Sequence, residues 1–208
     1  MPKPRPTKPA RKPANRYHHG DLPHAMLQEA VRTIQKEGVD ALTLRRVGER
    51  LGVSRTALYR HFADKQALLA AVAAEGFRTL RISLLEAWET GGRGRAGFDA
   101  MGLAYVQFAV THPSHYRVMF GGAVRPGKRR QDRNDPGTNA FQVLVDAIVE
   151  QQRAGLIRDD APLQLARFIW AVVHGVAMLA LDGILSATEA GSLARFANER
   201  MRTGLAPE

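Results

Sequence analysis

The sequence lacks several features that would place it in common functional classes. It contains no cysteine, which excludes a disulfide framework, a thiolate nucleophile and a cysteine-based metal site. The N-terminus has no apolar signal core, so we expect a cytoplasmic protein. The most apolar stretch, residues 165–181, is shorter than the roughly 20 residues of a membrane span, and it contains Arg167 and His174. We therefore expect no membrane partner there but a helix buried on several sides, for which a subunit interface is one explanation.

Acidic residues are scarce at the N-terminal end. Residues 1–16 contain six basic side chains, five prolines and no acid, and the whole chain has a net charge of +10. From residue 138 onward, acidic groups outnumber basic ones. This asymmetry predicts a polyanionic partner, with nucleic acid ahead of a membrane surface. We interpret residues 1–16 as a disordered basic arm, which is either a solvated tail or a segment that inserts into a minor groove.

Apolar residues recur with the helical period along the rest of the chain. In the first repeat Leu27, Ala30 and Ile34 share one face, and Gly38 ends it. No alternating pattern is long enough for a sheet, so an all-α fold is predicted. Glycine, proline and charge gather at 121–137, which we interpret as a mobile loop, with a contact of its KRR run to flanking DNA as the alternative. The helices are expected at residues 22–37, 43–51, 55–62, 65–90, 98–111, 114–120, 141–149, 162–182 and 188–203.

A helix-turn-helix is predicted near the N-terminus, where Gly52 supplies a tight turn between two short helices. On a helical wheel of the second helix, Leu58 and Phe62 lie within about 40° of each other and must face the neighbouring helices. The opposite direction carries Thr56 and Arg60. Such a helix can lie in the major groove of DNA, with its tip on base edges and its flanks on the phosphate walls.

The exposed side of this motif is rich in hydrogen-bond donors. Arg60 can read a guanine edge, and the Thr56 methyl group can contact a thymine methyl group. Ser54, Tyr59 and His61 suit phosphate oxygens. The side chains expected to contact DNA are Thr43, Arg45, Ser54, Arg55, Thr56, Tyr59, Arg60, His61 and Lys65.

The segment Thr43–Leu68 reads TLRRVGERLGVSRTALYRHFADKQAL and resembles the helix-turn-helix signature of the TetR family of transcriptional regulators over its whole length. The landmarks are Val47, Gly52-Val53-Ser54, Leu58-Tyr59, His61-Phe62, Lys65 and Leu68. Two positions depart from the pattern, since alanine is usual at Gly48 and glycine is frequent at Thr56. We expect the first to loosen its helix slightly and the second to change base preference. The resemblance implies a homodimer that binds double-stranded operator DNA.

Three further segments resemble a TetR subgroup whose C-terminal domain bears a Trp…His-Gly signature, here Trp170, His174 and Gly175. They are YHHGDL at 17–22, HPSHYRVMF at 112–120 and IWAVVHGVAMLALDG at 169–183. The resemblance implies that the two C-terminal helices of each subunit pair and that each C-terminal domain holds a small-molecule pocket. In most members, ligand binding repositions the DNA-reading heads and releases the operator.

Aromatic and methionine side chains at helical spacing are candidates for this pocket, so a largely apolar effector is expected. The candidates are Tyr105, Phe108, Tyr116, Met119, Phe120, Trp170 and His174. Trp170 and His174 lie four residues apart on one helix face, and the alternative is that they pack inside the core of the dimer. The sequence does not decide between pocket and dimer core.

Neither a metal nor a cofactor is expected. His18, His19 and His24 suit capping or phosphate contacts better than a metal, and His112 and His115 lack carboxylates at ligand spacing. No Ser/His/Asp grouping has the context of a catalytic motif, and no glycine-rich phosphate loop follows a strand. We therefore do not expect an enzyme.

The domain organisation follows from these observations. We predict a basic arm at 1–16, a helix-turn-helix DNA-binding domain at 17–66 and a helical effector-binding and dimerisation domain at 67–208. The predicted function is that of a sequence-specific transcriptional regulator, in the form of a repressor that a small-molecule effector releases from a palindromic operator. The alternative is a ligand-independent DNA-binding protein, either architectural or constitutively repressing.

Overall fold

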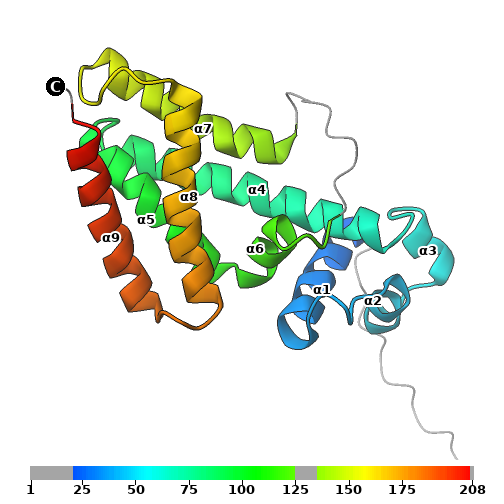
Figure 1. Cartoon of the computed structure of the whole chain (residues 1–208). Helices are drawn as coiled ribbons and strands as arrows, with labels where there is room; N and C mark the ends of the chain where they lie inside the picture. Colours follow the sequence, from blue (N-terminus) through cyan, green and yellow to red (C-terminus); the bar gives the residue numbers. More distant parts are fainter. Residues whose placement is uncertain (1–20, 125–134, 207–208) are drawn as a thin grey trace, which may run out of the picture.

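The computed structural model describes residues 21–124 and 135–206, and within these ranges the chain is helical and contains no strand (Figure 1). The all-α prediction is therefore confirmed. The predicted basic arm, His18, His19 and the KRR run lie outside the described residues. The helices are α1 (Leu22–Glu37), α2 (Leu44–Leu51), α3 (Arg55–Tyr59), α4 (Lys65–Thr90), α5 (Arg95–Thr111), α6 (Pro113–Phe120), α7 (Pro136–Arg153), α8 (Pro162–Leu181) and α9 (Ala187–Gly204).

Side-chain caps place the starts of the helices in the N-terminal head. Thr43, Ser54 and Asp64 stand before α2, α3 and α4, and each side-chain oxygen accepts a hydrogen bond from the backbone amide three residues on. Such a cap satisfies one of the amides that have no partner inside the helix. Gly52 ends α2 in the left-handed conformation with φ 66°, which a residue without a Cβ atom adopts at little cost. The turn between α2 and α3 thus follows from residue chemistry.

Helix α3 is shorter than the 55–62 that the sequence predicts, because it ends at Tyr59. The amides of His61 and Phe62 still donate to the Leu58 carbonyl, at 3.0 and 3.1 Å, so the chain continues as one further turn. The chain then leaves the helical conformation, because Asp64, the N-cap of α4, has an extended backbone. The predicted side-chain directions hold despite the shorter helix.

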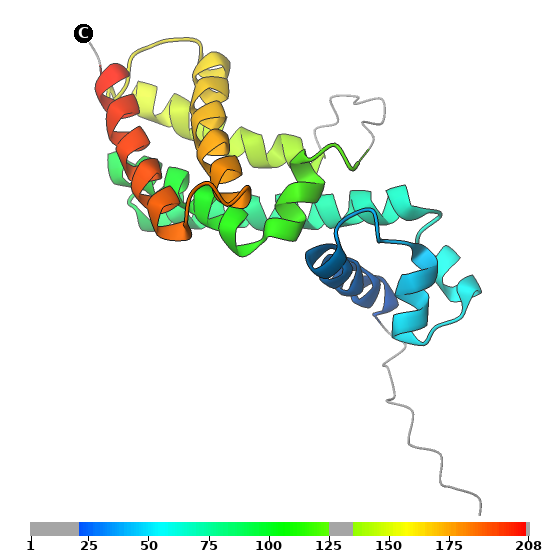
Figure 2. The same ribbon diagram turned by 60° about the horizontal axis from the view of Figure 1, so that its bottom comes forward.

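Helix α4 connects the head to the rest of the molecule. It is 26 residues long and packs against α1 at the head and against α5, α6 and α7 in the C-terminal part. In Figure 1 the head lies at one end of α4, and α5, α8 and α9 lie toward the other; Figure 2 shows α4 as one continuous rod between them. The predicted domain boundary between residues 66 and 67 falls just inside this helix, so both parts share it.

Close backbone contacts determine where α5 begins. It starts at Arg95, three residues before the predicted position. A Cβ atom on Gly97 would lie 2.7 Å from the Trp88 carbonyl oxygen, and one on Gly91 would lie 2.3 Å from the Gly97 α-carbon. Glycines at 91 and 97 therefore let the start of α5 pack directly on the end of α4.

Helix α8 is long and apolar enough to cross a membrane by length and composition alone. It packs against α5, α7 and α9, however, and one side of it is buried, including Val173 and Ala177. Other large apolar side chains of α8, such as Phe168, are exposed. This helix is therefore a core element with a second apolar side that nothing in the described chain covers.

Candidate functional sites

The tip of the head presents the predicted DNA-contacting side chains to solvent. Leu58 is only 2% exposed, whereas Tyr59 is 46% exposed. Arg60 and His61 are also exposed, and within residues 21–124 and 135–206 their side chains have no hydrogen-bond or ion-pair partner. Phe62 is partly buried against the core, as the helical wheel predicts. One side of α3 thus anchors the motif and the other is available to a partner.

Gly48 has a structural role that sequence reasoning missed. A Cβ atom at this position would lie 2.4 Å from Leu58 Cδ1. The Leu58 side chain thus occupies the space of the missing methyl group and packs α3 closely on α2. The sequence predicts only a slight loosening of the helix at Gly48, because the contact with a residue ten positions away is not visible in a helical pattern.

An ion-pair network fixes α1 to α2 behind this surface. The Arg50 guanidinium lies 2.9 Å from a Glu29 carboxylate oxygen and 2.6 Å from one of Glu37, and Arg46 lies 2.5 Å from the other oxygen of Glu37. The hydrogen bond from Arg50 lowers the pKa of Glu37 below its usual value, with a smaller contribution from Arg46. Both arginines are therefore engaged inside the head, a role that the sequence did not reveal.

Besides the capping residues Thr43 and Ser54, two of the predicted basic DNA contacts have partners within the protein. Arg45 forms an exposed ion pair with Glu49 at 2.8 Å, and Lys65 Nζ donates to the Asp40 carbonyl oxygen at 3.3 Å. An exposed pair of this kind contributes little to stability, so phosphate can replace Glu49 as the partner of Arg45. Lys65 joins the beginning of α4 to the loop before α2. The remaining predicted contacts lie on the same motif; they are Thr43, Ser54, Arg55 and Thr56, all exposed.

The C-terminal part contains a hydrogen-bonded aromatic cluster. The hydroxyl groups of Tyr105 and Tyr116 are 3.0 Å apart, and they lie 3.0 and 2.6 Å from Nδ1 of His174. Trp170 Nε1 donates to the Tyr105 hydroxyl at 2.9 Å. These four side chains come from α5, α6 and α8, so the fold joins residues that are 69 positions apart. We call them the aromatic cluster.

Burial keeps this cluster uncharged near neutral pH. Burial raises the pKa of Tyr105 to about 12 and raises that of Tyr116 further in the same direction, with the neighbouring Tyr105 adding to it. Burial lowers the pKa of His174 below its usual value. A neutral imidazole carries one N–H donor and one acceptor nitrogen, so Nδ1 of His174 and the Tyr116 hydroxyl group can pair in either direction, according to the tautomer. The cluster thus combines polar atoms with aromatic faces and carries no net charge.

The other predicted effector residues lie around the cluster to different degrees. The Phe120 ring is 4.9 Å from the His174 ring, centroid to centroid, and Phe108 stacks on His112 at 4.9 Å. Met119 instead packs against α4, where a Cβ atom on Gly76 would lie 2.5 Å from its sulfur. Sequence reasoning missed two neighbours, Phe77 at 5.4 Å from Phe120 and Phe141 at 5.8 Å from Trp170. Phe77 lies on α4 and Phe141 on α7, and the apolar pattern of these helices does not show which of their residues lie next to the aromatic cluster.

The part of the chain that the structure describes contains no group of three or more His, Asp or Glu side chains placed to hold a metal ion. His112 and His115, considered above as a possible pair, have ring centroids 6.0 Å apart.

Comparison with known proteins identifies the family. Residues 26–72 match the bacterial regulatory proteins of the tetR family, and residues 98–203, half of the chain, match the tetracyclin repressor-like C-terminal domain. The chain belongs to the TetR family. TetR-family proteins of this type are helix-turn-helix transcriptional regulators, so the chain is a DNA-binding regulator and not an enzyme.

Similar proteins agree with this assignment. The HTH-type transcriptional repressor Rv1474c of Mycobacterium tuberculosis is 27% identical over 175 residues, covering 80% of this chain and 81% of that protein. The class A tetracycline repressor from transposon 1721 of Escherichia coli is 47% identical over 51 residues, which is 24% of each chain. A solved structure of a protein with unknown function from Rhodococcus sp. RHA1 is 35% identical, with a TM-score of 0.82 over 93% of this chain and all of that one.

Proposed function

We propose that this TetR-family chain is a cytoplasmic, homodimeric repressor that binds a palindromic operator and releases it when a small, largely apolar molecule binds in the C-terminal domain. The observation that carries the DNA-binding part is the exposed tip of α3, where Arg60 and His61 have no partner in the described chain. The repressor part rests on the curated relatives, several of which are repressors.

The proposed DNA contacts follow from the geometry of the head. Arg60 and Thr56 face outward at the end of the helix that enters the major groove, so they would meet base edges. Ser54, Tyr59 and His61 would meet phosphates on the flanks. If a dimer neutralises about 6–10 phosphates, operator affinity should fall by roughly 10³–10⁵ between 50 and 200 mM salt. A flat salt titration would contradict this part of the proposal.

We infer that the dimer forms through α8 and α9. Large exposed apolar side chains of the described chain gather on these helices and on the turn between them, where a partner subunit would cover them. They are Leu163, Phe168, Met178, Leu179, Ile184 and Phe196. Pairing of two such faces in a C2 dimer would bury the same surface on both subunits.

The aromatic cluster is the proposed effector site. It lies between α5, α6 and α8, it is uncharged, and its hydroxyl, imidazole and indole groups can orient a neutral ligand. A ligand selective for the folded state raises the melting temperature, so a thermal-shift screen of apolar metabolites and drugs finds candidates. A true effector should lose its shift in Tyr116→Phe and release operator DNA from the wild-type protein. A screen without any such compound would favour the alternative, a ligand-independent DNA-binding protein.

Helix α4 is the proposed carrier between the two sites. It begins at Lys65 near the DNA-binding tip, and its last turn, which contains the buried Trp88, ends at Thr90 in the C-terminal part. A ligand that tilts α4 would change the separation of the two heads in the dimer. In vitro selection of bound DNA, repeated with and without the effector, tests operator choice and release together. An effector-bound structure with unchanged head spacing but lost operator affinity would contradict the lever.

A further inference from the structure

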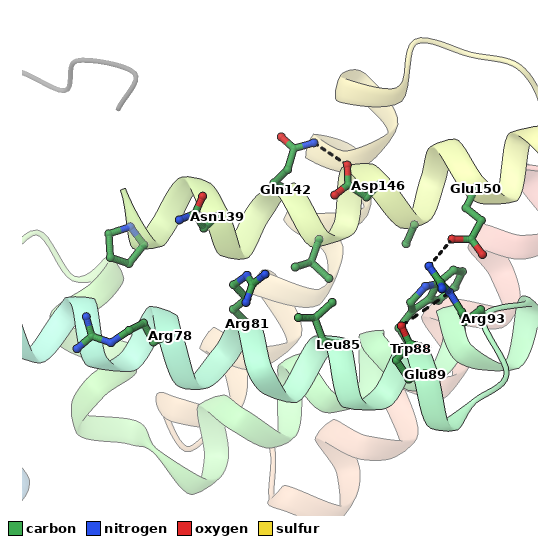
Figure 3. A pocket seen from close by; sticks show the side chains of 13 residues that line it. Arg78, Arg81, Leu85, Trp88, Glu89, Arg93, Asn139, Gln142, Asp146 and Glu150 are labelled. Carbon is green, nitrogen blue, oxygen red and sulfur yellow. Dashed lines mark hydrogen bonds and ion pairs between the residues drawn. The ribbon is translucent and has the colours of Figure 1, made fainter. Parts of the chain in front are cut away.

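A groove lies between α4 and α7, on a different face from the aromatic cluster. It has a volume of about 620 Å³, within the range of small-molecule sites. Figure 3 shows the two helices running side by side in front of α8 and α9, with the groove between them. No residue of the aromatic cluster lines it. The groove is therefore a separate candidate site.

One end of the groove carries positive charge that the protein does not neutralise. Arg78 and Arg81 are three residues apart on α4, so they lie on neighbouring positions of one helix face. Both are exposed, and neither side chain has an acceptor among the residues that the structure describes. In Figure 3 Arg81 extends into the space between the helices, near Asn139 of α7. The nearby acid Asp135 is engaged elsewhere, because the amide and hydroxyl of Thr138 donate to it at 2.8 and 3.0 Å.

The opposite end of the groove is lined by charged groups that form ion pairs with one another. Arg93 lies 3.1 Å from a Glu150 carboxylate oxygen and 3.8 Å from one of Glu89. Gln142 donates to Asp146 at 2.8 Å along α7, but this pair stands beside the middle of the groove, above Leu85 in Figure 3. The far end is lined by Glu89, Arg93 and Glu150. This end therefore carries a net negative charge and offers no site for an anion.

Apolar side chains form the middle of the groove. Leu85 and Trp88 line it from α4, and Val143 and Ala147 line it from α7. Trp88 lies seven positions after Arg81, which corresponds to about 10 Å along the helix. The groove thus offers a positive end, a centre lined by these apolar side chains and by the Gln142–Asp146 pair, and a negative end.

We propose that this groove binds a small organic monoanion, with its carboxylate on Arg81 and its apolar part on Leu85 and Val143. In Figure 3 Arg78 points along α4 away from Arg81, so it adds positive charge to this end without facing the same carboxylate. A carboxylate accepts charge-assisted hydrogen bonds from a guanidinium group, which can bind it in a bidentate manner. The negative far end excludes a second anionic group and so selects a ligand with a single charged head. This inference does not depend on the proposed repressor function, because binding is measured without DNA.

The test is isothermal titration calorimetry of the full chain with hexanoate, acetate and hexanamide. Hexanoate should bind more tightly than acetate, because only its alkyl chain covers the apolar centre. It should also bind more tightly than hexanamide, because only the carboxylate carries charge. Arg81→Gln should weaken hexanoate binding by roughly tenfold to a hundredfold, and Arg78→Gln should weaken it less, because the Arg78 side chain points away from the carboxylate.

Two matched variants locate the binding. Arg153→Gln removes the same charge from the end of α7, outside the groove, and should leave hexanoate affinity unchanged. Tyr116→Phe alters the aromatic cluster and should also leave it unchanged. The inference is overturned if hexanoate does not bind the wild-type protein, if hexanamide binds equally well, or if Arg81→Gln binds as the wild type does. Loss of binding in Tyr116→Phe alone would place the anion in the cluster and equally overturn it.

Discussion

Leu58 and Arg60 stand two residues apart and point to opposite sides of the head. The first fills the space above Gly48, and the second has no partner in the described chain. The burial of Leu58 could be predicted from the sequence, since the wheel of a short helix determines which side chains share a face. The contact with Gly48 could not, because it depends on the turn that brings α3 onto α2.

Replacing Arg60 tests the assignment of base contacts. Arg60→Ala should weaken binding to a selected operator by about 1–3 kcal/mol and leave binding to a scrambled duplex nearly unchanged, because base contacts carry the specificity. Fluorescence anisotropy with both duplexes measures the difference. Arg153→Ala, which removes a charge far from the head, should change neither value. Equal losses on both duplexes for Arg60→Ala would assign this side chain to phosphate instead.

The aromatic cluster gives stability a pH dependence on both sides of neutrality. Burial lowers the pKa of His174, so the unfolded chain binds more protons as the pH falls below 6.5, and the free energy of unfolding should decrease there. Burial raises the pKa of Tyr105 and Tyr116, so stability should also fall as the pH rises above 10. Denaturant unfolding at a series of pH values measures both limbs.

A single substitution separates His174 from the other titrating groups. His174→Gln should make the acid limb shallower without removing it, because burial also lowers the pKa of His115. Glu37 affects stability only at lower pH. Its pKa is lowered in the folded protein, so its contribution to the free energy of unfolding is lost as the pH falls below about 4.5, its usual value. An unchanged slope between pH 6.5 and 5 in His174→Gln would exclude the cluster as its source.

At the scale of elements, the junction of α4 and α5 depends on glycines that face backbone. Gly97→Ala would place a methyl group 2.7 Å from the Trp88 carbonyl oxygen, where no side chain can move away. We expect a loss of about 1–3 kcal/mol in the free energy of unfolding, measured by urea denaturation. Gly191→Ala on α9 is the control, because its nearest neighbour would be an arginine nitrogen at 3.8 Å. That variant should be neutral or gain up to about 1 kcal/mol from helix propensity.

Element boundaries show what the sequence could predict and what it could not. The starts of α2, α3 and α4 were predictable, because Thr43, Ser54 and Asp64 are caps whose chemistry is local. The early start of α5 was not, since it follows from a close contact between two helices. The four members of the aromatic cluster were predicted as candidates, but their hydrogen bonds were not, because they join three helices far apart in the sequence.

At the scale of the whole molecule, the apolar surface of α8 and α9 is the feature that a single chain leaves open. Phe168 is 53% exposed and Phe196 is 56% exposed, although both are large aromatic groups. Phe168→Glu should shift the protein from dimer to monomer in sedimentation velocity, because a charge would be buried in the proposed interface. Operator affinity should fall with it, since a monomer engages only one half-site.

A control variant distinguishes loss of the dimer from a failure to fold. Ile82→Glu places the same charge on an equally exposed apolar residue of α4, 53% exposed and away from α8 and α9. It should remain dimeric. Circular dichroism of both variants confirms helix content, and a dimeric, folded Phe168→Glu would assign the interface to another surface.

Because α4 is one unbroken helix, a small tilt at its C-terminal end produces a larger displacement at the DNA-binding head. At 1.5 Å of rise per residue its 26 residues span about 39 Å. Tilting a rod of that length by about 5° displaces its far end by about 3 Å, which is the whole length of a hydrogen bond. A tilt of a few degrees is therefore enough, in geometric terms, to break the contact that we propose between Arg60 and a base.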